Sequence, residues 1–234
     1  MRLHLTFLGH KLTVSTFHGQ TFQAPPPTTF SHSYAHHTDW VTSLVLVNQN
    51  RNLVTASHDQ TLLLWPNRGL FSGTTSETDM EPRRLGHHLD YVKALAYSSH
   101  INQVFSGGLD RRIIAWDVGE GRDLAARIVH HDSQPSGSVY CLASNSFGTT
   151  VVSGSPDKIV KIHDPRTSDG NVARLTGHSD LVRAVLVSED GRIVVSGGAD
   201  SMVKVWDVRM GRCSVTYTHH AYVLLSPPAV FTCT

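Results

Sequence analysis

Short runs in which apolar and polar residues alternate recur between residues 36 and 218. The first kind of run includes VTSLVLV, VKALAYS and VRAVLVS. A second kind ends in small residues and Asp, as in LVTASHD and VVSGGAD, and a third ends in an aromatic residue, as in TLLLW and MVKVW. Alternation with a period of two, bounded by Gly, Ser and Asp, is typical of short antiparallel strands. The pattern therefore predicts an all-β chain.

These runs return in the same order four times. HHTDWV at 36–41 reappears as HHLDYV at 87–92, and the same offset of 51 carries Asp59 to Asp110. Two further steps, of 47 and 43 residues, carry the aspartate into two more units. Four strands in a unit of about 40–50 residues are the signature of a β-propeller blade. The predicted units are residues 36–86, 87–134, 135–176 and 177–218.

The units also share a motif of the form GH…D…WD. It is legible in GHHLDYV…GGLDRRIIAWD and in GHSDLV…GGADSMVKVWD. On these residues the chain resembles the WD-repeat proteins, whose fold is a β-propeller. The resemblance implies a hydrogen-bond network in each blade, made by a His, a Ser or Thr, an Asp and a Trp. The matching residues are His37, Thr55, Asp59 and Trp65; His88, Ser106, Asp110 and Trp116; and His178, Ser196, Asp200 and Trp206.

The third unit departs from this motif. Pro135 stands where the histidine is expected, Gly137 replaces the loop Asp, and His163 replaces the tryptophan. Ser153 and Asp157 remain. Because an orphaned buried polar group costs about 1–3 kcal/mol, we expect this unit to be the least rigid blade.

Both ends of the chain lie outside the pattern. Residues 1–35 contain QAPPPTT and are predicted to be a partly disordered non-repeat segment, whereas residues 219–234 open a fifth unit that meets Pro227 and Pro228. Proline is not tolerated in a central strand, so the fifth unit looks aborted. The resemblance implies rings of seven or eight blades, which need about 300 residues. We therefore expect an incomplete, open part of such a ring, with a true four-bladed ring as the alternative.

Composition excludes several classes of function. Lys and Arg number 20 against 19 Asp and Glu, so bulk charge predicts neither a nucleic-acid nor a membrane partner. The three cysteines are far apart and lack CxxC spacing, which argues against a disulfide framework. No apolar run approaches the roughly 20 residues that span a bilayer. We expect an intracellular protein of the cytoplasm or nucleus.

Histidine is the one unusual count, at 16, and it raises the question of metal binding. Adjacent histidines occur at 36/37, 87/88, 130/131 and 219/220. Neighbouring residues on a strand point to opposite faces, so such a pair rarely holds one ion. The chain also lacks a Gly-rich phosphate loop, G-x-S-x-G and H-E-x-x-H. We therefore expect no catalytic residue, no metal and no cofactor.

Several phrases narrow the resemblance within the WD-repeat proteins. HHTDWV, DYVKALAY, GTTVVSGS and DPRT resemble the WD-repeat cofactors that bind and activate ubiquitin-specific proteases. This resemblance implies a non-catalytic regulatory subunit, with a ubiquitin-specific protease as partner and ubiquitin as a further candidate. The alternatives are a substrate receptor of a cullin-RING ubiquitin ligase, suggested by Trp206-Asp207-x-Arg209 and by Asp164 with Arg166, and a generic assembly subunit.

Partner contacts in this family are expected where each inner strand begins and just before the turn Asp. Because aromatic residues and Arg are enriched at interface hot spots, three of these positions stand out, namely Trp40, Tyr91 and Arg183. The full candidate set is Trp40, Thr42, His58, Tyr91, Lys93, Leu109, Tyr140, Leu181 and Arg183.

Overall fold

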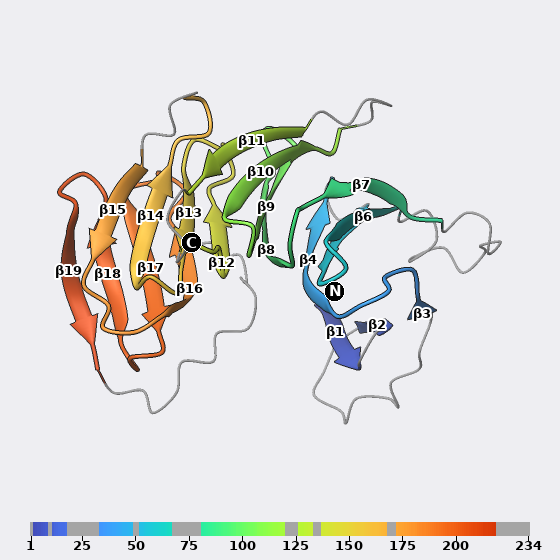
Figure 1. The fold of residues 1–234 in the computed structure, drawn as a ribbon, viewed down its shortest axis with the longest axis horizontal. Coiled ribbons are helices and arrows are strands. Elements are labelled where there is room, and N and C mark those ends of the chain that lie inside the picture. The colour runs from blue at the N-terminus through green and yellow to red at the C-terminus, as the bar shows by residue number, and fades with distance from the viewer. Residues whose placement is uncertain are drawn as a thin grey trace.

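The fold is built from β-strands throughout the part of the chain that the computed structural model describes (Figure 1). The described residues are 2–8, 11–17, 33–48, 52–66, 81–119, 126–132, 137–167 and 172–218. They form four four-stranded antiparallel sheets and one three-stranded sheet. The predicted fold class is thereby confirmed, with four blades that follow one another along the chain.

Each blade is a meander, in which every strand pairs with the next one in sequence. Blade 1 contains β4 (Val41–Val47), β5 (Asn52–Ser57), β6 (Thr61–Pro66) and β7 (Arg83–His87). Blade 2 contains β8 (Val92–Ser98), β9 (Gln103–Gly108), β10 (Arg112–Asp117) and β11 (Ala126–His131). Blade 3 contains β12 (Cys141–Ser144), β13 (Val151–Gly154), β14 (Ile159–His163) and β15 (Val172–Thr176). Blade 4 contains β16 (Val182–Val187), β17 (Ile193–Gly198), β18 (Val203–Asp207) and β19 (Arg212–Tyr217).

The blades stack face to face, and their first strands lie next to one another in the order β4, β8, β12, β16. The apolar side of each alternating strand forms the seam. Val54 and Val92 share the seam between blades 1 and 2, and Phe105 and Leu142 share the next one. All four side chains are almost inaccessible to solvent. Strands covered by a neighbouring blade on each face, such as β13 with the sequence VVSG, are buried at every residue and carry apolar or small side chains on both faces.

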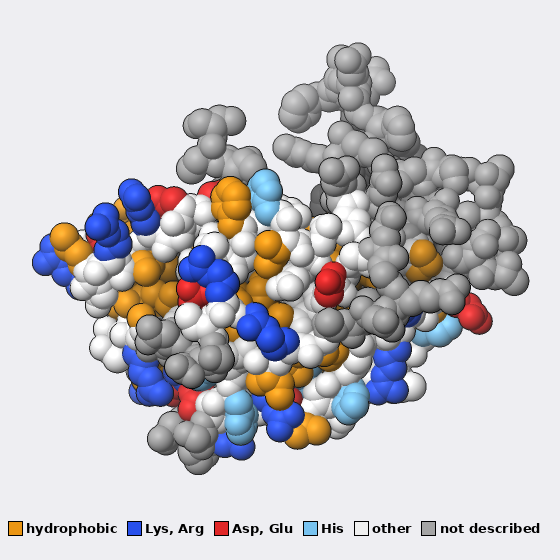
Figure 2. Space-filling model, turned by 90° about the horizontal axis from the view of Figure 1, so that it is seen from above, with side chains coloured by type: hydrophobic (Ala, Val, Ile, Leu, Met, Phe, Trp, Pro, Cys, Tyr) orange, Lys and Arg blue, Asp and Glu red, His pale blue; other side chains and the backbone are white. Residues whose placement is uncertain are grey.

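Blade 4 differs because no further described blade covers its forward face. Strand register places Ile193, Val195, Val205, Val215 and Tyr217 on this face. Val195 is only half-buried, and Ile193 and Tyr217 are 49% and 55% exposed. Phe105, which holds the position of Val195 in blade 2, is 0% exposed. Hydrophobic side chains are visible at this end of the molecule, on the left of Figure 2. An uncovered last blade is what an open array predicts.

The N-terminal segment contains more structure than its sequence suggested. Three strands, β1 (Arg2–Leu8), β2 (Lys11–Phe17) and β3 (Ser33–Tyr34), form an antiparallel sheet in that order. β3 leads into β4 as each outer strand leads into the next inner strand, so this sheet has the strand order of the last three strands of a blade. The predicted fifth unit, 219–234, lies outside the described residues.

No helix long and apolar enough to cross a bilayer occurs among the described residues. No group of three or more His, Cys, Asp or Glu side chains is placed to hold a metal ion in the same part of the chain.

Candidate protein-interaction site and the networks that hold it

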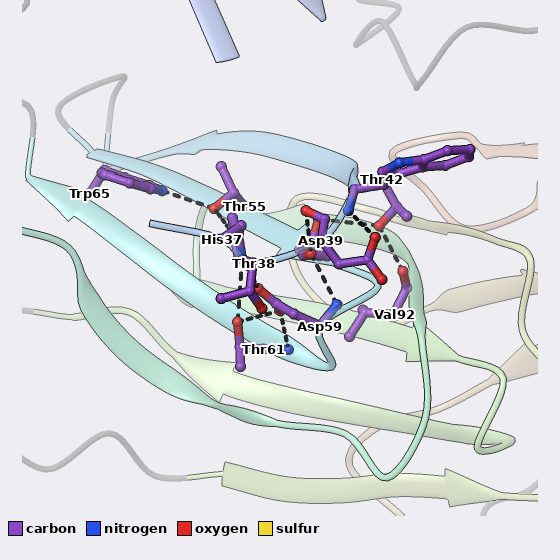
Figure 3. Close-up of polar contacts among 12 residues, drawn as sticks. His37, Thr38, Asp39, Thr42, Thr55, Asp59, Thr61, Trp65 and Val92 are labelled. Atoms are coloured by element: carbon purple, nitrogen blue, oxygen red, sulfur yellow. Dashed lines mark hydrogen bonds and ion pairs between the residues drawn. The ribbon is translucent and has the colours of Figure 1, made fainter. Parts of the chain in front are cut away.

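A chain of hydrogen bonds fastens the turn of blade 1 to its strands (Figure 3). Trp65 Nε1 donates to Thr55 Oγ1 at 2.8 Å, and Thr55 Oγ1 lies 2.7 Å from His37 Nε2. His37 Nδ1 lies 2.8 Å from Asp59 Oδ2. Because the ionised carboxylate can only accept, His37 Nδ1–H donates to Asp59, and Nε2 of the neutral ring then accepts the proton of the Thr55 hydroxyl. The network thus assigns the tautomer of a buried histidine.

Blades 2 and 4 repeat this arrangement. The histidine Nε2 to serine Oγ distances are 2.6 and 2.7 Å, and the histidine Nδ1 to carboxylate distances are 2.9 and 2.8 Å. Both tryptophan Nε1 atoms donate to the serine Oγ at 2.7 Å. The structure brings together His88, Ser106, Asp110 and Trp116 in blade 2, and His178, Ser196, Asp200 and Trp206 in blade 4.

The turn aspartate organises backbone as well as side chains. Asp110 accepts N–H bonds from Leu89 on one side and Arg112 on the other, at 3.1 and 3.2 Å. Burial alone would raise the pKa of Asp110, but the hydrogen bonds from His88, Leu89 and Arg112 outweigh it and hold the pKa below its ordinary value. Asp59 and Asp200 show the same balance, with lowered pKa values against burial. The carboxylate is therefore the ionised centre of each network.

Blade 3 places an aspartate at the histidine position. β11 ends at His131, opposite the first residue of β10, and β7 ends at His87, opposite the first residue of β6. The residues that follow are Asp132 and His88, whose backbone N–H groups donate to the carbonyl just before the third strand, at 3.0 and 2.9 Å. Asp132 therefore occupies the histidine position of blade 3. The prediction from the sequence, which put Pro135 at this position, was wrong. Pro135 itself lies outside the described residues.

A buried lysine then joins the two acidic groups of blade 3. Lys161 Nζ donates to Asp132 Oδ2 at 2.7 Å and to Asp157 Oδ2 at 2.5 Å, and its side chain is 3% exposed. Asp157 Oδ1 still accepts the N–H of Ile159 at 3.0 Å, as the other turn aspartates do. Blade 3 therefore has a network of its own, in which the cation comes from strand β14. The lower rigidity expected of this blade stays a prediction, and it now has to be weighed against the ionic network of Asp132, Lys161 and Asp157.

Two histidines replace the tryptophan and the glycine on which it packs. His163 Nε2 lies 2.9 Å from Ser153 Oγ, where the other blades have an indole N–H. Its ring lies 4.6 Å from that of His130. His130 takes the register position that Gly86 has before blade 2, where a Cβ atom would lie 2.2 Å from the ring of Trp116. The smaller imidazole of His163 leaves the room that His130 fills.

Where the inner strands of blades 1 and 2 begin, the half-buried ring of His58 stacks between two exposed rings. Trp40 stacks on His58 with a centroid distance of 5.9 Å, and His58 stacks on Tyr91 at 4.5 Å with only 14° between the planes. Trp40 is 62% exposed and Tyr91 41%. The His58 N–H donates to the Trp40 carbonyl at 2.9 Å, which fixes the turn beneath the stack. We call Trp40, His58 and Tyr91 the ring platform.

Lys93 adds a charge beside the ring platform. Its Nζ donates to His58 Nε2 at 2.7 Å, which requires His58 to be neutral and to carry its proton on Nδ1. Burial and then the charge of Lys93 lower the pKa of His58. Burial also lowers the pKa of Lys93, against the nearby charge of Asp90. An amphipathic surface of this kind, with aromatic rings around a partly desolvated cation, has the composition of an interface hot spot.

The family is settled by comparison with known proteins. The family described as WD domain, G-beta repeat matches residues 28–66, 81–117, 125–164 and 170–207, which is more than half of the chain. The chain belongs to the WD domain family. The third match covers β11 to β14, although the histidine and tryptophan positions of that WD repeat hold Asp132 and His163.

Not every candidate contact residue of the WD repeats is free for a partner. The Thr42 hydroxyl lies 2.6 Å from the Val92 carbonyl and so joins blade 1 to blade 2. Leu109 and Leu181 are half-buried, whereas Arg183 is exposed and Tyr140 is 37% exposed. The WD repeats thus bring Trp40, His58, Tyr91 and Lys93 together, while the remaining candidates lie on blades 3 and 4 or at the seams.

Two residues of the blade 3 network were not singled out from the sequence. Lys161 stands where the other WD repeats have Leu63, Ile114 and Lys204, and a charged residue inside the apolar run IVKIH was a usable signal. Asp132 follows His131 as His88 follows His87. The loop after Asp132 is longer than the loop after His88, and it hides this correspondence in the sequence.

Proposed function

We propose that this WD-repeat chain is a non-catalytic subunit that binds and activates ubiquitin-specific proteases. WD repeats commonly mediate protein–protein interaction, so a scaffold role follows from the family itself. The finer assignment is supported by the phrases that resemble the WD-repeat cofactors of these proteases, such as WD repeat-containing protein 48. The observation that carries it is the ring platform, which offers a rigid, exposed aromatic surface at a blade seam.

Rigidity matters to this proposal because ordering side chains costs about 0.5–1.5 kcal/mol for each one immobilised on binding. The ring platform is already ordered by stacking and by the Lys93–His58 hydrogen bond. A partner that covers Trp40 and Tyr91 therefore loses little affinity to ordering. Ring faces and edges suit an apolar side chain on the protease, and Lys93 suits a carboxylate beside it.

A direct experiment compares the purified chain with a panel of ubiquitin-specific proteases, measuring binding and hydrolysis of a fluorogenic ubiquitin conjugate. We expect at least one protease to bind and to hydrolyse faster in its presence. Trp40→Ala with Tyr91→Ala is expected to weaken that binding at least tenfold, because hot-spot residues cost about 2 kcal/mol or more. Failure of every protease to bind would contradict the proposal.

The matched control is Phe147→Ala. Phe147 is 53% exposed and stacks on His100 at 4.5 Å, so it is an exposed stacked ring like those of the platform. It belongs to the turn between the first two strands of blade 3, at the opposite end of the strands. Binding should be unchanged by this substitution. An equal loss in both variants would indicate unspecific damage and would contradict the assigned face.

The alternative partner, a cullin-RING ubiquitin ligase, rests on the Arg residues after the third strands. Arg166 is held by Asp164 within its own turn, with Nε to Oδ1 and Nη2 to Oδ2 distances of 2.9 and 2.6 Å. Arg209 is exposed. Mass spectrometry of proteins captured by the chain distinguishes the classes, because a ligase receptor captures a cullin adaptor and loses it on Arg209→Ala.

A further inference from the structure

Blade 3 contains a buried histidine pair that its network does not satisfy. His130 Nε2 and His163 Nδ1 are both buried and have no hydrogen-bond partner among the described residues. The two rings lie 4.6 Å apart at the seam where β11 of blade 2 leads into blade 3. A buried ring nitrogen without a partner is a site where protonation has a large energetic consequence.

The charges around the pair oppose a bound proton. The groups that face His163 are His130, Lys161 and Asp132, and those that face His130 also include Arg174 and His131. Asp132 is the one acid among them, and it is already paired with Lys161 at 2.7 Å. Burial, followed by these cations, lowers the pKa of His163 to about 3. The folded blade therefore holds this ring neutral.

We propose that the His130–His163 pair makes the seam of blade 3 an acid-sensitive element, which loosens at mildly acidic pH while the other three blades keep their networks. Proton uptake places a positive charge beside Lys161 with no free carboxylate to receive it. The blade relieves that charge by exposing the rings, which moves β11 (Ala126–His131) away from β14 (Ile159–His163). Blades 1, 2 and 4 have no such pair, since tryptophan occupies the position of His163 in each.

The sign of the effect follows from linkage. His163 in the unfolded chain has the ordinary pKa of 6.5, so the unfolded state takes up a proton before the folded state does. The stability contributed by the neutral ring is fully present above pH 6.5 and is lost as the pH falls toward 3. The window that matters is therefore pH 7 to 5.

Hydrogen–deuterium exchange of the whole chain at pH 7 and pH 5, corrected for the intrinsic exchange rate, tests this proposal. We expect protection of β14 and β11 to fall on the order of tenfold, because each pH unit below the unfolded pKa shifts the equilibrium by up to tenfold. β18 in blade 4, whose Trp206 replaces the titrating ring, should be unchanged. Equal loss of protection in β14 and β18, or none in β14, would overturn the proposal.

The matched variant is His130→Gly with His163→Trp, which recreates the Gly86 and Trp116 pairing and removes both titrating rings. Its β14 should show no acid response. A second variant, His163→Gln, keeps a side-chain amide near Ser153 and removes the ring of residue 163 while His130 remains, so its acid response should be smaller than that of the unchanged chain if the double variant folds poorly. Retention of the full acid response in the folded variant would overturn the proposal.

Discussion

Blades 2 and 3 solve the same structural problem with different chemistry. In blade 2 a neutral His88 joins Ser106 to the Asp110 carboxylate, so the network carries one negative charge. In blade 3 two carboxylates and the Lys161 ammonium also leave one negative charge. In both blades a hydrogen-bond donor contacts the turn aspartate. His88 supplies it in blade 2 from the segment before the first strand, and Lys161 supplies it in blade 3 from strand β14.

The same comparison extends to volume. Trp116 packs on Gly86 so closely that a Cβ atom there would lie 2.2 Å from the ring. Blade 3 exchanges the large and small partners for His130 and His163, two rings of similar size. Because protein interiors are close-packed, His130→Gly and His163→Trp are expected to be tolerated only when they are made together.

The largest expected effect is on Lys161. Lys161→Met leaves Asp132 and Asp157 buried without their cation, and breaking a buried ion pair costs about 3–5 kcal/mol. Lys204→Met is the control at the equivalent position of blade 4, where Nζ donates to the neutral Thr216 hydroxyl at 3.1 Å, and should cost less than about 1 kcal/mol. Urea unfolding measures both. An equal loss of unfolding free energy in Lys161→Met and Lys204→Met would contradict the ionic network of blade 3.

A smaller loss is expected for the turn aspartate of blade 2. Asp110→Ala leaves His88 Nδ1 without its acceptor and removes two backbone hydrogen bonds, so we expect the free energy of unfolding to fall by about 2–3 kcal/mol. Asp117 is an exposed residue that accepts the N–H of Gly119, so Asp117→Ala should change the free energy of unfolding by less than about 0.5 kcal/mol. A loss as small in the first variant as in the second would contradict the network role.

The blades should also differ in the pH range over which they lose stability. The lowered pKa values of Asp59, Asp110 and Asp200 mean that their stabilisation is fully present above the unfolded value of 3.8 and is lost only as the pH falls below it. The lowered pKa of His163 costs stability from pH 6.5 downward, by about 1 kcal/mol for each pH unit. Unfolding followed from pH 8 to 3 should therefore show two regions. A single loss below pH 4 would contradict the difference between the blades.

The smallest effect on stability is expected at the ring platform. Trp40→Ala and Lys93→Glu alter exposed or half-exposed side chains and should change the free energy of unfolding by about 0.5 kcal/mol or less. Partner binding should nevertheless weaken, because Lys93→Glu reverses the charge at the edge of the platform. Thermal unfolding and titration with the bound protease measure the two quantities separately. A large loss of stability would identify the platform as structural.

The sequence predicted the parts of this fold that repeat and missed those that do not. Period-two alternation and the shared spacing predicted the strands, and the resemblance to WD-repeat proteins implied the residues of three networks. Asp132 was missed because it lies 25 residues before Asp157, against 22 between His88 and Asp110, so the alignment selected Pro135 instead. The N-terminal hairpin was missed although RLHLTFL and KLTVSTF each alternate, since neither run carries the repeat motif.

The candidate site was accessible to prediction only in pieces. Trp40, His58 and Tyr91 were each selected by position within a unit, but their stacking joins two units and depends on how blade 1 sits against blade 2. The role of Thr42 at the same seam was hidden for the same reason, because its acceptor is a backbone carbonyl of the next blade. Contacts between repeats depend on how two blades pack, and the residue spacing within one repeat gives no information about that packing.

The measurement that tests this account most directly is a double-mutant cycle between Asp132 and Lys161. Asp132→Asn, Lys161→Met and the double variant, unfolded in urea, should give an interaction energy of about 1–3 kcal/mol, because the two residues are in direct contact. The same cycle with Asp117→Ala in place of Asp132→Asn should be additive within about 0.5 kcal/mol, because Asp117 is an exposed residue of blade 2 that accepts the N–H of Gly119. Additivity for Asp132 and Lys161 would contradict the claim that blade 3 is fastened by its own ionic network.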